Sequence, residues 1–595
     1  MSVLWWVLAG FVAYWIGLTV LSRQVNLPEN VSTSGPIITV RTTRGRVFLD
    51  RLSRPKRFWR AWGNFGIGVA LVIMVGMFLA VVNAGIAALF APERTAVSQP
   101  QNVLVIPGVN EFLPLSVAPE IVIGLLIGLV VHEGGHGLLC RVENIRIDSM
   151  GVALIAIIPL GAFVQPEERS QMRADRGGKS RMFAAGVMNN IVVTIITFIL
   201  LFALVGSLIA VAPGAAIAGT YAGSAAETAG LDAGDRIVEF DGTPIENGSA
   251  FEERLDSTDQ TTISVVTADG EQHSVDRYLS ATGVIPDAPT GIDRGDRIDR
   301  VNDEPVLTSD AFHQAIEGDA IATIESNDSE YTFPAGAHIE HIDPDGQFAA
   351  AGAVPDGEER PVITAIDDER VVTATDLQAI LGETGPGDTI TIEAHWIEIG
   401  EPFSSDNDPE TYEVTVDEDG LIGVGITHGT TGLIVTDFGT QQYESELFLA
   451  TLGGDVDEEP IFGLDGFFGK LFGAMILPIA SLFGGVADQN FAGFTGTVTA
   501  FYEVNGPLAG LEPIVFITAN ILFWAGWINF NLGIFNCIPA FPLDGGHLLR
   551  SSAESVISRL PIDNRYVAVK YVTVSVGLLM LLGLLTMIFG QGLLA

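Results

Sequence analysis

The stretch IVIGLLIGLVVHEGGHGLLC, residues 121–140, is apolar enough to cross a membrane but carries two histidines and a glutamate. A helix that crosses a hydrocarbon core of about 30 Å needs about 20 apolar residues, which this segment supplies. An ionisable side chain near the middle of a bilayer costs about 2.5–3.5 kcal/mol, so such residues usually face the inside of a helix bundle and have a function. We therefore expect a membrane helix bundle built around His132, Glu133 and His136.

His132 and His136 are four residues apart and share one helix face, so both imidazoles can bind one metal ion. Glu133 would lie beside a metal-bound water in this H-E-x-x-H pattern. The alternative is a set of polar side chains that hydrogen-bond to one another. Gly134 and Gly135 each cost about 1 kcal/mol of helix stability in water. They either allow close packing of a neighbouring helix or leave room for a bound peptide.

A zinc enzyme usually supplies three protein ligands and keeps a fourth position open, so a third ligand must come from elsewhere in the chain. The segment NCIPAFPLDGGH, residues 536–547, offers Asp544, a carboxylate between a proline-interrupted apolar segment and a Gly-Gly turn. Asp544 has the alternative role of a helix cap or turn former. His547 is the second candidate for the third ligand.

Six apolar segments are long enough to span a bilayer. They are residues 3–21, 63–91, 117–140, 182–212, about 513–535 and 568–592. Nine basic residues lie between positions 23 and 60 and seven between 141 and 181, which makes both loops cytoplasmic by the positive-inside rule. The first segment has no basic stretch before it and is expected to be a retained anchor with the N-terminus outside.

Residues 461–486 are also apolar, but they contain Asp465, Lys470, Pro478 and several glycines. A further span here would reverse the orientation of everything that follows, and the basic residues after position 549 argue against that reversal. We therefore expect an interfacial or re-entrant segment.

The chain of 595 residues has a formal net charge of -42, and the charge is concentrated in one block. Residues 213–460 hold 54 of the 72 acidic residues and 8 of the 30 basic ones. Such acidity argues against a nucleic-acid partner and is typical of a surface that stays hydrated in high salt. Apolar strands alternating with Gly and Asp turns favour folded domains over a disordered tail. The two cysteines, Cys140 and Cys537, exclude a disulfide framework.

The acidic block contains an internal repeat. GLDAGDRIVEFDGTPI at 230–245 aligns with GIDRGDRIDRVNDEPV at 291–306, and a fainter copy, VITAIDDERVV, begins at residue 362. Each copy predicts a turn, a strand, a tight turn and a short helix, such as 308–316 or 375–381. The copies resemble PDZ domains of the bacterial, protease-associated kind, which implies peptide segments bound by strand addition. The alternative is a solubilising ectodomain with empty grooves.

Together these motifs resemble the site-2 protease family of intramembrane zinc metalloproteases. HEGGH resembles the family's H-E-x-x-H on a transmembrane helix, and NCIPAFPLDGG resembles its N-x-x-P-x-x-P-L-D-G-G. GVALIAIIPLGAFVQPEE at 151–168 resembles its membrane-associated hairpin, and AAGVMNNIVVT at 184–194 its G-P-x-x-N helix, with Val187 in place of the usual proline. The match covers about residues 116–212 and 513–560.

The resemblance implies that His132, His136 and Asp544 are the zinc ligands. Zinc lowers the pKa of its bound water toward about 7, so that Glu133 can take the proton as hydroxide attacks a peptide carbonyl and return it to the leaving amine.

Asn190 and Asn536 are suited to holding an extended substrate strand or the developing oxyanion. Helix–helix hydrogen bonding is an equal alternative for both. The hairpin around Gly161 and Phe163 is expected to offer a strand edge to the substrate backbone.

The predicted fold is a polytopic α-helical membrane protein of about six spans with inserted extracytoplasmic PDZ-like α+β domains. An N-terminal transmembrane region precedes the first half of the protease core, three PDZ-like repeats, an acidic linker with the interfacial or re-entrant segment, and the second half of the core with the C-terminal span. In that order the predicted boundaries are 1–115, 116–212, 213–280, 281–345, 346–430, 431–512 and 513–595. The acidic block lies outside the cell membrane, and His136 and Asp544 lie toward its cytoplasmic side.

The predicted function is zinc-dependent regulated intramembrane proteolysis. The substrate would be a single-span membrane protein, and membrane lipid would surround the enzyme. The family resemblance alone implies that another protease trims the substrate beforehand. One alternative is a catalytically silent PDZ scaffold, against which the intact H-E-x-x-H and Asp544 argue. Another is a zinc carrier, which would need polar residues along a path through the bilayer, whereas the sequence has one cluster.

Overall fold

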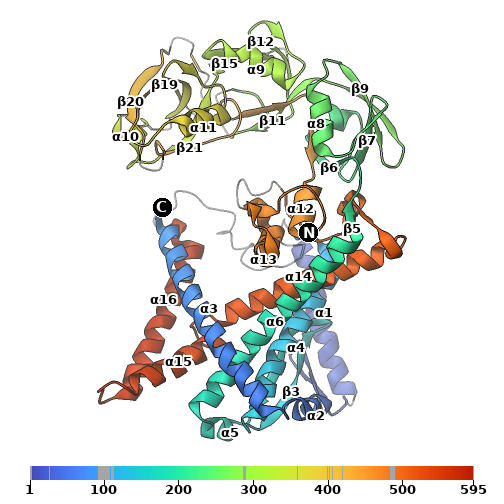
Figure 1. Ribbon diagram of the computed structural model, residues 1–595, viewed down its shortest axis with the longest axis vertical. Coiled ribbons are helices and arrows are strands. Elements are labelled where there is room, and N and C mark those ends of the chain that lie inside the picture. Colours follow the sequence, from blue (N-terminus) through green and yellow to red (C-terminus); the bar gives the residue numbers. More distant parts are fainter. Residues whose placement is uncertain are drawn as a thin grey trace. The chain divides into compact units, whose positions relative to one another are not determined.

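The computed structural model divides the chain into two compact units, each described separately (Figure 1). The membrane unit comprises Met1–Ala210, Glu446–Thr499 and Glu503–Ala595, and the β unit comprises Val211–Ser445 and Ala500–Tyr502. The structure describes residues 3–25, 27–90, 107–108, 113–285, 290–327, 329–357, 359–398, 400, 403–404, 407–417, 420–482 and 489–593.

Five helices in the described part of the membrane unit are long and apolar enough to cross a bilayer. They are α3 (Lys56–Phe90), α4 (Ala118–Val142), α6 (Arg176–Leu208), α14 (Glu512–Asn536) and α16 (Arg565–Leu593). Each coincides with a predicted span, so the prediction of a polytopic helical membrane protein is confirmed. The remaining predicted span, residues 3–21, falls on the 22-residue helix α1 (Val3–Gln24).

The helices α4, α6 and α14 form the centre of the membrane unit because small residues let their backbones approach closely. A Cβ atom added at Gly124 of α4 would lie 3.0 Å from the backbone of Trp524 in α14. The Trp524 side chain is fully buried. The helix α15 (Asp544–Ile557) follows α14 after a short loop and packs against α6 and α16.

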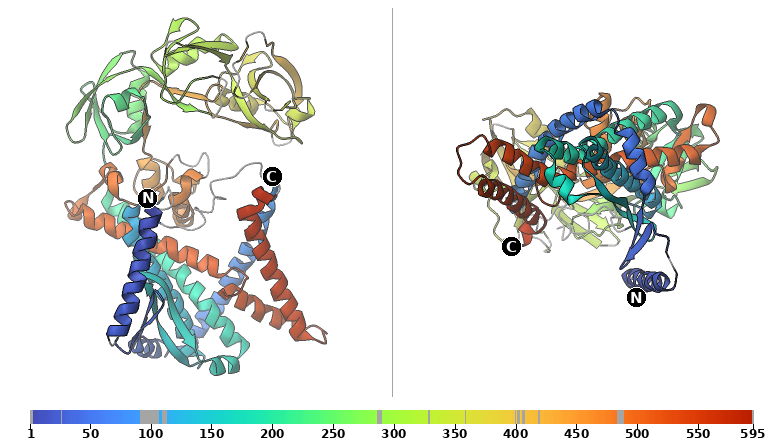
Figure 2. Two further views of the ribbon diagram at one scale, coloured as in Figure 1. Left: turned by 180° about the vertical axis from the view of Figure 1, so that it is seen from behind. Right: turned by 90° about the horizontal axis from the view of Figure 1, so that it is seen from below.

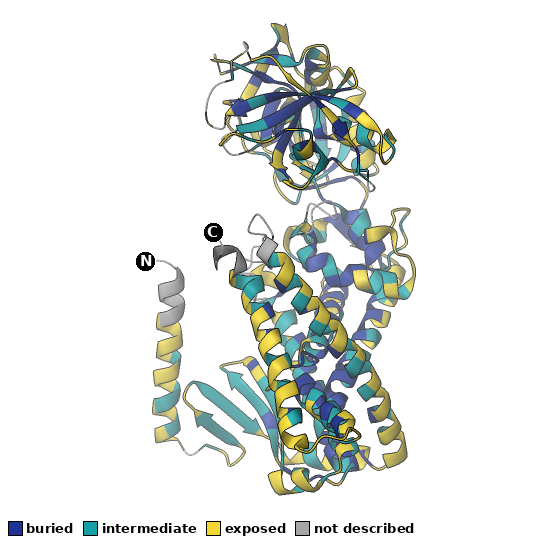
Figure 3. Cartoon of the chain, turned by 90° about the vertical axis from the view of Figure 1, so that its left-hand side faces the viewer, coloured by how far each residue is buried: buried dark blue, intermediate teal, exposed yellow. Residues whose placement is uncertain are grey.

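A four-stranded antiparallel sheet lies beside α4 and carries the predicted hairpin at one edge. Its strands, in order, are β1 (Val31–Ser34), β2 (Ile37–Arg41), β3 (Ile147–Ile155) and β4 (Ile158–Pro166). The sequence predicted only a basic loop where β1, β2 and the following helix α2 (Thr43–Leu52) are found. Helix α1 stands apart from the helix bundle, beyond the sheet, and is mostly exposed along its described side chains (Figures 2 and 3).

The apolar segment at 461–482 forms α13 (Gly466–Ile476), followed by a 3-10 turn over Leu477–Leu482. Together they have 17 residues, fewer than the 20 or so that span a bilayer. The indole N–H of Trp527 donates to the Met475 carbonyl at 3.0 Å and attaches this segment to α14. A short attached helix agrees with the predicted interfacial or re-entrant element; residues 483–486 of that prediction lie outside the described residues.

The β unit contains three modules of one topology, each an antiparallel sheet with a short helix. The strands of module 1 are β6 (Ala215–Thr220), β7 (Arg236–Phe240), β9 (Thr262–Thr267) and β10 (Gln272–Asp276), and its helix is α8 (Gly248–Asp256). Module 2 has β11 (Leu279–Val284), β12 (Arg297–Val301), β14 (Ile321–Ser326), β15 (Ser329–Pro334) and α9 (Ser309–Glu317). Module 3 has β16 (Ala337–Ile342), β17 (Glu359–Ile366), β19 (Thr389–Glu398), β20 (Glu410–Thr415) and α11 (Ala374–Glu383).

The modules are nested, because the chain adds a last strand to each of them on its way back. The strand β21 (Val424–Ile426) pairs with β16 of module 3, β22 (Leu433–Thr436) with β11 of module 2, and β23 (Thr440–Gln442) with β6 of module 1. Module 3 is therefore inserted into module 2, and module 2 into module 1. The predicted boundaries 213–280, 281–345 and 346–430 treat the three modules as consecutive and do not include this nesting. The strands β22 and β23 fall in the segment predicted as a linker.

The local elements of the repeat agree with the sequence prediction. The predicted short helices at 308–316 and 375–381 correspond to α9 and α11. Each module has a two-residue turn in which both residues have positive φ, the turn that joins twisted antiparallel strands. The turns are Asp241–Gly242, Asn302–Asp303 and Asp367–Asp368.

Where the chain passes between modules 1 and 2, a buried ion pair joins the outgoing and returning segments. The guanidinium of Arg277 binds Oδ2 of Asp437, and the two side chains are 2% and 8% exposed. Arg277 also donates to the Thr258 carbonyl at 2.6 Å. Burial raises the pKa of Asp437 even though the Arg277 charge opposes the rise. The pair therefore connects two chain segments that are distant in sequence, at a cost in desolvation.

We expect Arg277→Met to destabilise this crossing by about 3–5 kcal/mol, because it leaves the Asp437 carboxylate buried without its cation. Hydrogen exchange of the full-length protein in detergent would detect faster exchange in β22 and β23. The double variant Arg277→Met, Asp437→Leu removes both charges and should recover most of the protection. Unchanged exchange in the single variant would contradict the expectation.

Candidate metal and catalytic site

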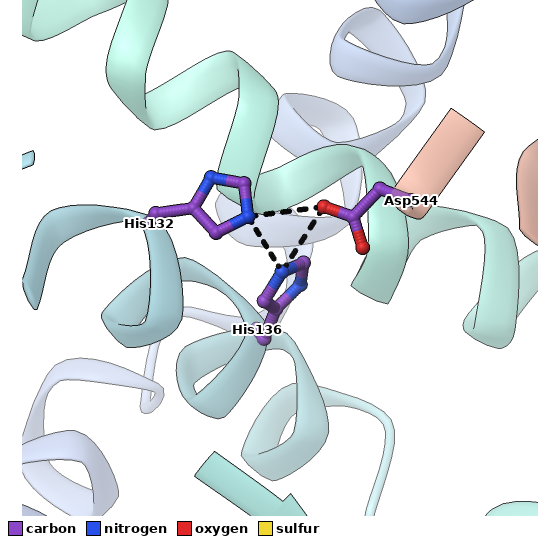
Figure 4. Close-up of side chains that lie close together, drawn as sticks. All are labelled: His132, His136 and Asp544. Atoms are coloured by element: carbon purple, nitrogen blue, oxygen red, sulfur yellow. Dashed lines mark hydrogen bonds and ion pairs between the residues drawn. The ribbon is translucent and has the colours of Figure 1, made fainter. Parts of the chain in front are cut away.

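Three potential metal ligands converge between two helices of the membrane unit (Figure 4). Nε2 of His132 and Nε2 of His136 lie 3.1 and 3.2 Å from the same oxygen, Oδ2 of Asp544. The two nitrogens are 3.2 Å apart. His132 and Asp544 are buried, with 7% and 9% of their surface exposed. The structure thus brings together the three residues that the sequence predicted as ligands.

The elements that carry these residues explain the convergence. His132 and His136 are one helical turn apart on α4, and Asp544 is the first residue of α15. The loop between α14 and α15 can lie directly against the start of α15 because of the Gly-Gly pair. A Cβ atom at Gly545 would lie 2.3 Å from the Cys537 carbonyl oxygen, and one at Gly546 would lie 2.8 Å from the backbone of Ala540.

Both imidazoles have a partner on α6 for the ring nitrogen that faces away from Asp544. Nδ1 of His136 lies 2.8 Å from the Met182 carbonyl oxygen, so it donates its proton there and leaves Nε2 free to bind a metal. Nδ1 of His132 lies 3.4 Å from the side-chain amide of Asn190, whose Oδ1 is buried without a hydrogen bond in the described structure. Turning that amide by 180° would let Oδ1 accept from His132 and would satisfy both groups.

The three ligand atoms are spaced as ligands of one zinc ion would be. A tetrahedral zinc ion with bonds of about 2.0–2.1 Å holds its ligand atoms about 3.3 Å apart, close to the separations of 3.1–3.2 Å found here. Two imidazole lone pairs and a carboxylate oxygen repel one another at this distance unless a cation or shared protons lie between them. Two histidines and a carboxylate are also a ligand set that suits a catalytic zinc. The residues present therefore fit the metal.

Glu133 opens onto an apolar cavity of about 450 Å³ beside the ligand cluster. Its Oε2 accepts a hydrogen bond of 2.8 Å from the backbone N–H of Val164 in β4. The cavity is also lined by Gly134 of α4 and by Ala162 and Phe163 of β4. The Glu133 carboxylate, next in sequence to the candidate ligand His132, is therefore fixed at the edge of the hairpin beside the cavity.

The two glycines of HEGGH have different surroundings. A Cβ atom at Gly135 would lie 2.8 Å from the Ala185 carbonyl oxygen, so this glycine allows α4 and α6 to pack closely. A Cβ atom at Gly134 would meet no described atom within 4 Å. The sequence left two roles open for these glycines, close helix packing or room for a bound peptide. Gly135 allows the close packing, and Gly134 leaves free space in the cavity.

The predicted substrate-binding residues lie in different environments. Gly161 has open space around it, and Phe163 lines the cavity. Asn190 contacts His132 instead of facing the cavity, and the amide of Asn536 donates to the Leu532 carbonyl of its own helix at 2.9 Å. Direct contact of either asparagine with a substrate stays a prediction.

Three other residues singled out in the sequence lie apart from the ligand cluster. The ring of His547, the second candidate for the third ligand, stacks on Phe183 with a centroid distance of 4.2 Å. His547 is not part of the described ligand group. Cys140 and Cys537 are both buried free thiols.

Sequence reasoning missed two residues that shape the site. Gly186 of α6 faces the imidazoles, and a Cβ atom there would lie 2.7 Å from His132 and 2.8 Å from His136. Asn189 lines the cavity, and its Oδ1 accepts a 3.1 Å hydrogen bond from the indole of Trp62 in α3. Both lie in AAGVMNNIVVT, where only Asn190 was given a role. The signal for Gly186 was its place directly before the position of the usual proline.

The fold and the site define a polytopic membrane protein in which an H-E-x-x-H motif and an aspartate form a candidate metal site. Residues 120–584 match peptidase family M50, and the chain belongs to this family, which includes the site-2 proteases that its motifs resemble.

Two relatives of known sequence align with parts of the chain. An uncharacterized protein of Methanocaldococcus jannaschii is 27% identical over 185 residues, which are 31% of this chain and 47% of that protein. A Nostoc protein named "Putative zinc metalloprotease" is 35% identical over 113 residues, 18% of this chain and 30% of that protein. The chain therefore spans less than half the length of each relative.

We expect Asp544→Ala to weaken zinc binding by at least about 100-fold, because even the loss of a group that only orients a ligand costs about 10–100-fold. Zinc per chain would be measured by mass spectrometry after dialysis against a weak chelator. His547→Ala is the matched control, since it removes a potential ligand three residues away, and should keep the metal. Full zinc occupancy in Asp544→Ala would exclude this residue as a ligand.

Proposed function

We propose that the protein is a zinc-dependent intramembrane endopeptidase that carries out regulated intramembrane proteolysis of single-span membrane proteins. The observation that carries the proposal is the convergence of His132, His136 and Asp544 beside Glu133, whose carboxylate lies at a strand edge within an apolar cavity. Membership of family M50 supports a peptidase, and the named Nostoc relative supports zinc as the metal.

Each residue of the site has a definite task in this reaction. His132, His136 and Asp544 would hold the zinc, which supplies Lewis acidity for activating water and polarising the scissile carbonyl. Glu133 takes the proton from the attacking water and delivers it to the leaving amine. The Met182 carbonyl and Asn190 hold the two imidazoles in the tautomer that presents Nε2.

The outer edge of β4, at the end of the described sheet, would bind the substrate as an additional strand. The N–H of Val164 points away from β3 toward Glu133, and the alternation of a strand places the backbone groups of Ala162 on the same edge. A peptide paired there runs through the cavity that Gly134 keeps open. A transmembrane helix must unwind to bind in this way, which places its peptide bond within reach of water.

The three modules of the β unit suit a second contact with the substrate outside the membrane. In each sheet the returning strand, β21, β22 or β23, has one neighbour and forms an edge of the described sheet. An edge strand of a PDZ-like domain binds extended peptides by strand addition. Together with the basic loops that the positive-inside rule places in the cytoplasm, this arrangement supports inspection of the substrate outside and cleavage toward the cytoplasmic side.

Glu133→Gln should reduce cleavage of a model single-span substrate by about 10²–10⁴-fold, the usual contribution of a general base. The amide keeps the shape of the side chain, so zinc content should stay at the wild-type level. The assay would use purified protein in bilayer nanodiscs with the substrate in the same disc. Undiminished cleavage by this variant would overturn the mechanism, and wild-type protein with bound zinc that cleaves no membrane substrate would argue against a peptidase.

Gly134→Leu tests whether the cavity holds the substrate. Leucine is a better helix former than glycine and would meet no described atom at its Cβ, so the fold and the zinc content should be retained. Its side chain fills part of the cavity, and cleavage should fall at least about 10-fold while Gly134→Ala stays near wild type. Equal activity in the two variants would show that the substrate binds elsewhere.

A further inference from the structure

A second cavity, of about 480 Å³, lies where α6, α15 and α16 meet, away from the ligand cluster. Its apolar wall includes Phe541, Ile557 and Val569. Ile557 and Val569 are buried, and Phe541 is half-exposed. The cavity therefore has an apolar base formed by packed helices of the membrane unit, and its remaining lining is mostly charged.

The charged lining consists of four basic residues and one acidic residue: Arg176, Arg550, Arg565, Lys570 and Glu554. Glu554 is shared, because its carboxylate oxygens lie 3.3 Å from Arg550 and 3.8 Å from Arg176. No ion pair of Arg565 or Lys570 is found within the described residues. The cavity therefore has an excess of positive charge that the protein does not neutralise.

The cations lie at the level where a membrane helix leaves the hydrocarbon core. Arg176 is the first residue of α6 and Arg565 the first of α16, and no charged residue follows Arg181 in α6 or Lys570 in α16. Basic pockets between transmembrane helices at this depth bind the phosphate groups of anionic lipids. Arginine is the preferred partner of phosphate, because its planar guanidinium can donate two parallel hydrogen bonds.

We propose that this cavity binds the phosphate-bearing headgroup of an anionic phospholipid. The exposed face of α16 favours a lipid over free phosphate, because apolar residues continue along the helix from Lys570 in the direction of the bilayer centre. They are Val574, Leu578, Leu581 and Leu585, each more than 40% exposed. The headgroup contacts the basic residues of the cavity, and the acyl chains lie along these four exposed apolar residues of α16. One phospholipid molecule can therefore contact both the charged cavity and the apolar helix face.

Lipid binding here acts on the metal site through α15. This helix begins with Asp544 and carries Arg550 and Glu554 two and three turns later. An anion held by Arg176, Arg550 and Arg565 joins α15 to the first turns of α6 and α16. The same helix α6 supplies the partners of both imidazoles, so the lipid fixes Asp544 relative to the two histidines.

The test uses full-length protein that has been delipidated in neutral detergent and titrated with phosphatidylglycerol under native mass spectrometry. Arg565→Gln, Lys570→Gln removes the two cations without an ion-pair partner, and binding should weaken about 30-fold, since each cation near an anionic lipid contributes about 1 kcal/mol. Arg173→Gln, Arg559→Gln is the matched control, because it removes two exposed charges outside the cavity. This control should bind within about 3-fold of wild type. The helical circular-dichroism signal reports that both variants are folded.

Phosphatidylcholine and inorganic phosphate are the comparison ligands. Retention of phosphatidylglycerol in preference to phosphatidylcholine, with no displacement by millimolar phosphate, supports the proposal. Equal weakening in the two double variants would overturn it, because general surface charge would then explain the binding. Displacement by inorganic phosphate would overturn the lipid assignment in favour of a soluble anion. The measurement does not depend on proteolysis, so its failure leaves the peptidase proposal untouched.

Discussion

The membrane unit depends on one constraint, the placement of three proton-binding groups within 3.2 Å of one another in a bundle of apolar helices. His132, His136 and Asp544 cannot remain there as mutually repelling lone pairs, and they have little access to water. A divalent cation removes the repulsion and turns the same arrangement into a source of stability. Binding of a metal at this candidate site would therefore be linked to folding of the helix bundle.

Holding the cluster together requires backbones to approach closely at particular positions, and glycine provides this on each helix involved. Gly135 brings α4 against α6, Gly186 leaves space for both imidazoles, and the pair after Asp544 lets the preceding loop lie on α15. A methyl group at any of these positions would lie less than 3.0 Å from a neighbouring atom, so the helices or the imidazoles would have to shift. Gly134 differs, because an added Cβ there meets open space at the cavity and no neighbouring helix.

The spans and the three residues of the candidate metal site could be predicted from the sequence because their signals are local. An apolar run of 20 residues or an i, i+4 histidine pair specifies its structure without distant partners. Features set by distant pairing were missed: the strand β2, whose neighbour β3 lies more than 100 residues further on, and the returning strands β21 to β23. Three-residue and four-residue strands carry too little periodicity to be recognised alone. Gly186 was missed for a related reason, since its role depends on the helix that faces it.

The nesting of the β unit imposes an order on its assembly. The strands of module 3 are contiguous between Ala337 and Ile426, so this module can close its sheet without the others. Module 2 then needs β22 to reach β11, and the folded module 3 between them acts as a short connector in place of a flexible loop of nearly 100 residues. By the same argument module 1 closes last, because β23 must reach β6 across the folded modules 2 and 3. The Arg277–Asp437 pair lies beside the pairing of Ser280 with Thr436, so the closure of module 2 already brings its two residues together. The cost of desolvating this pair is therefore met after the apolar core of module 3 has formed.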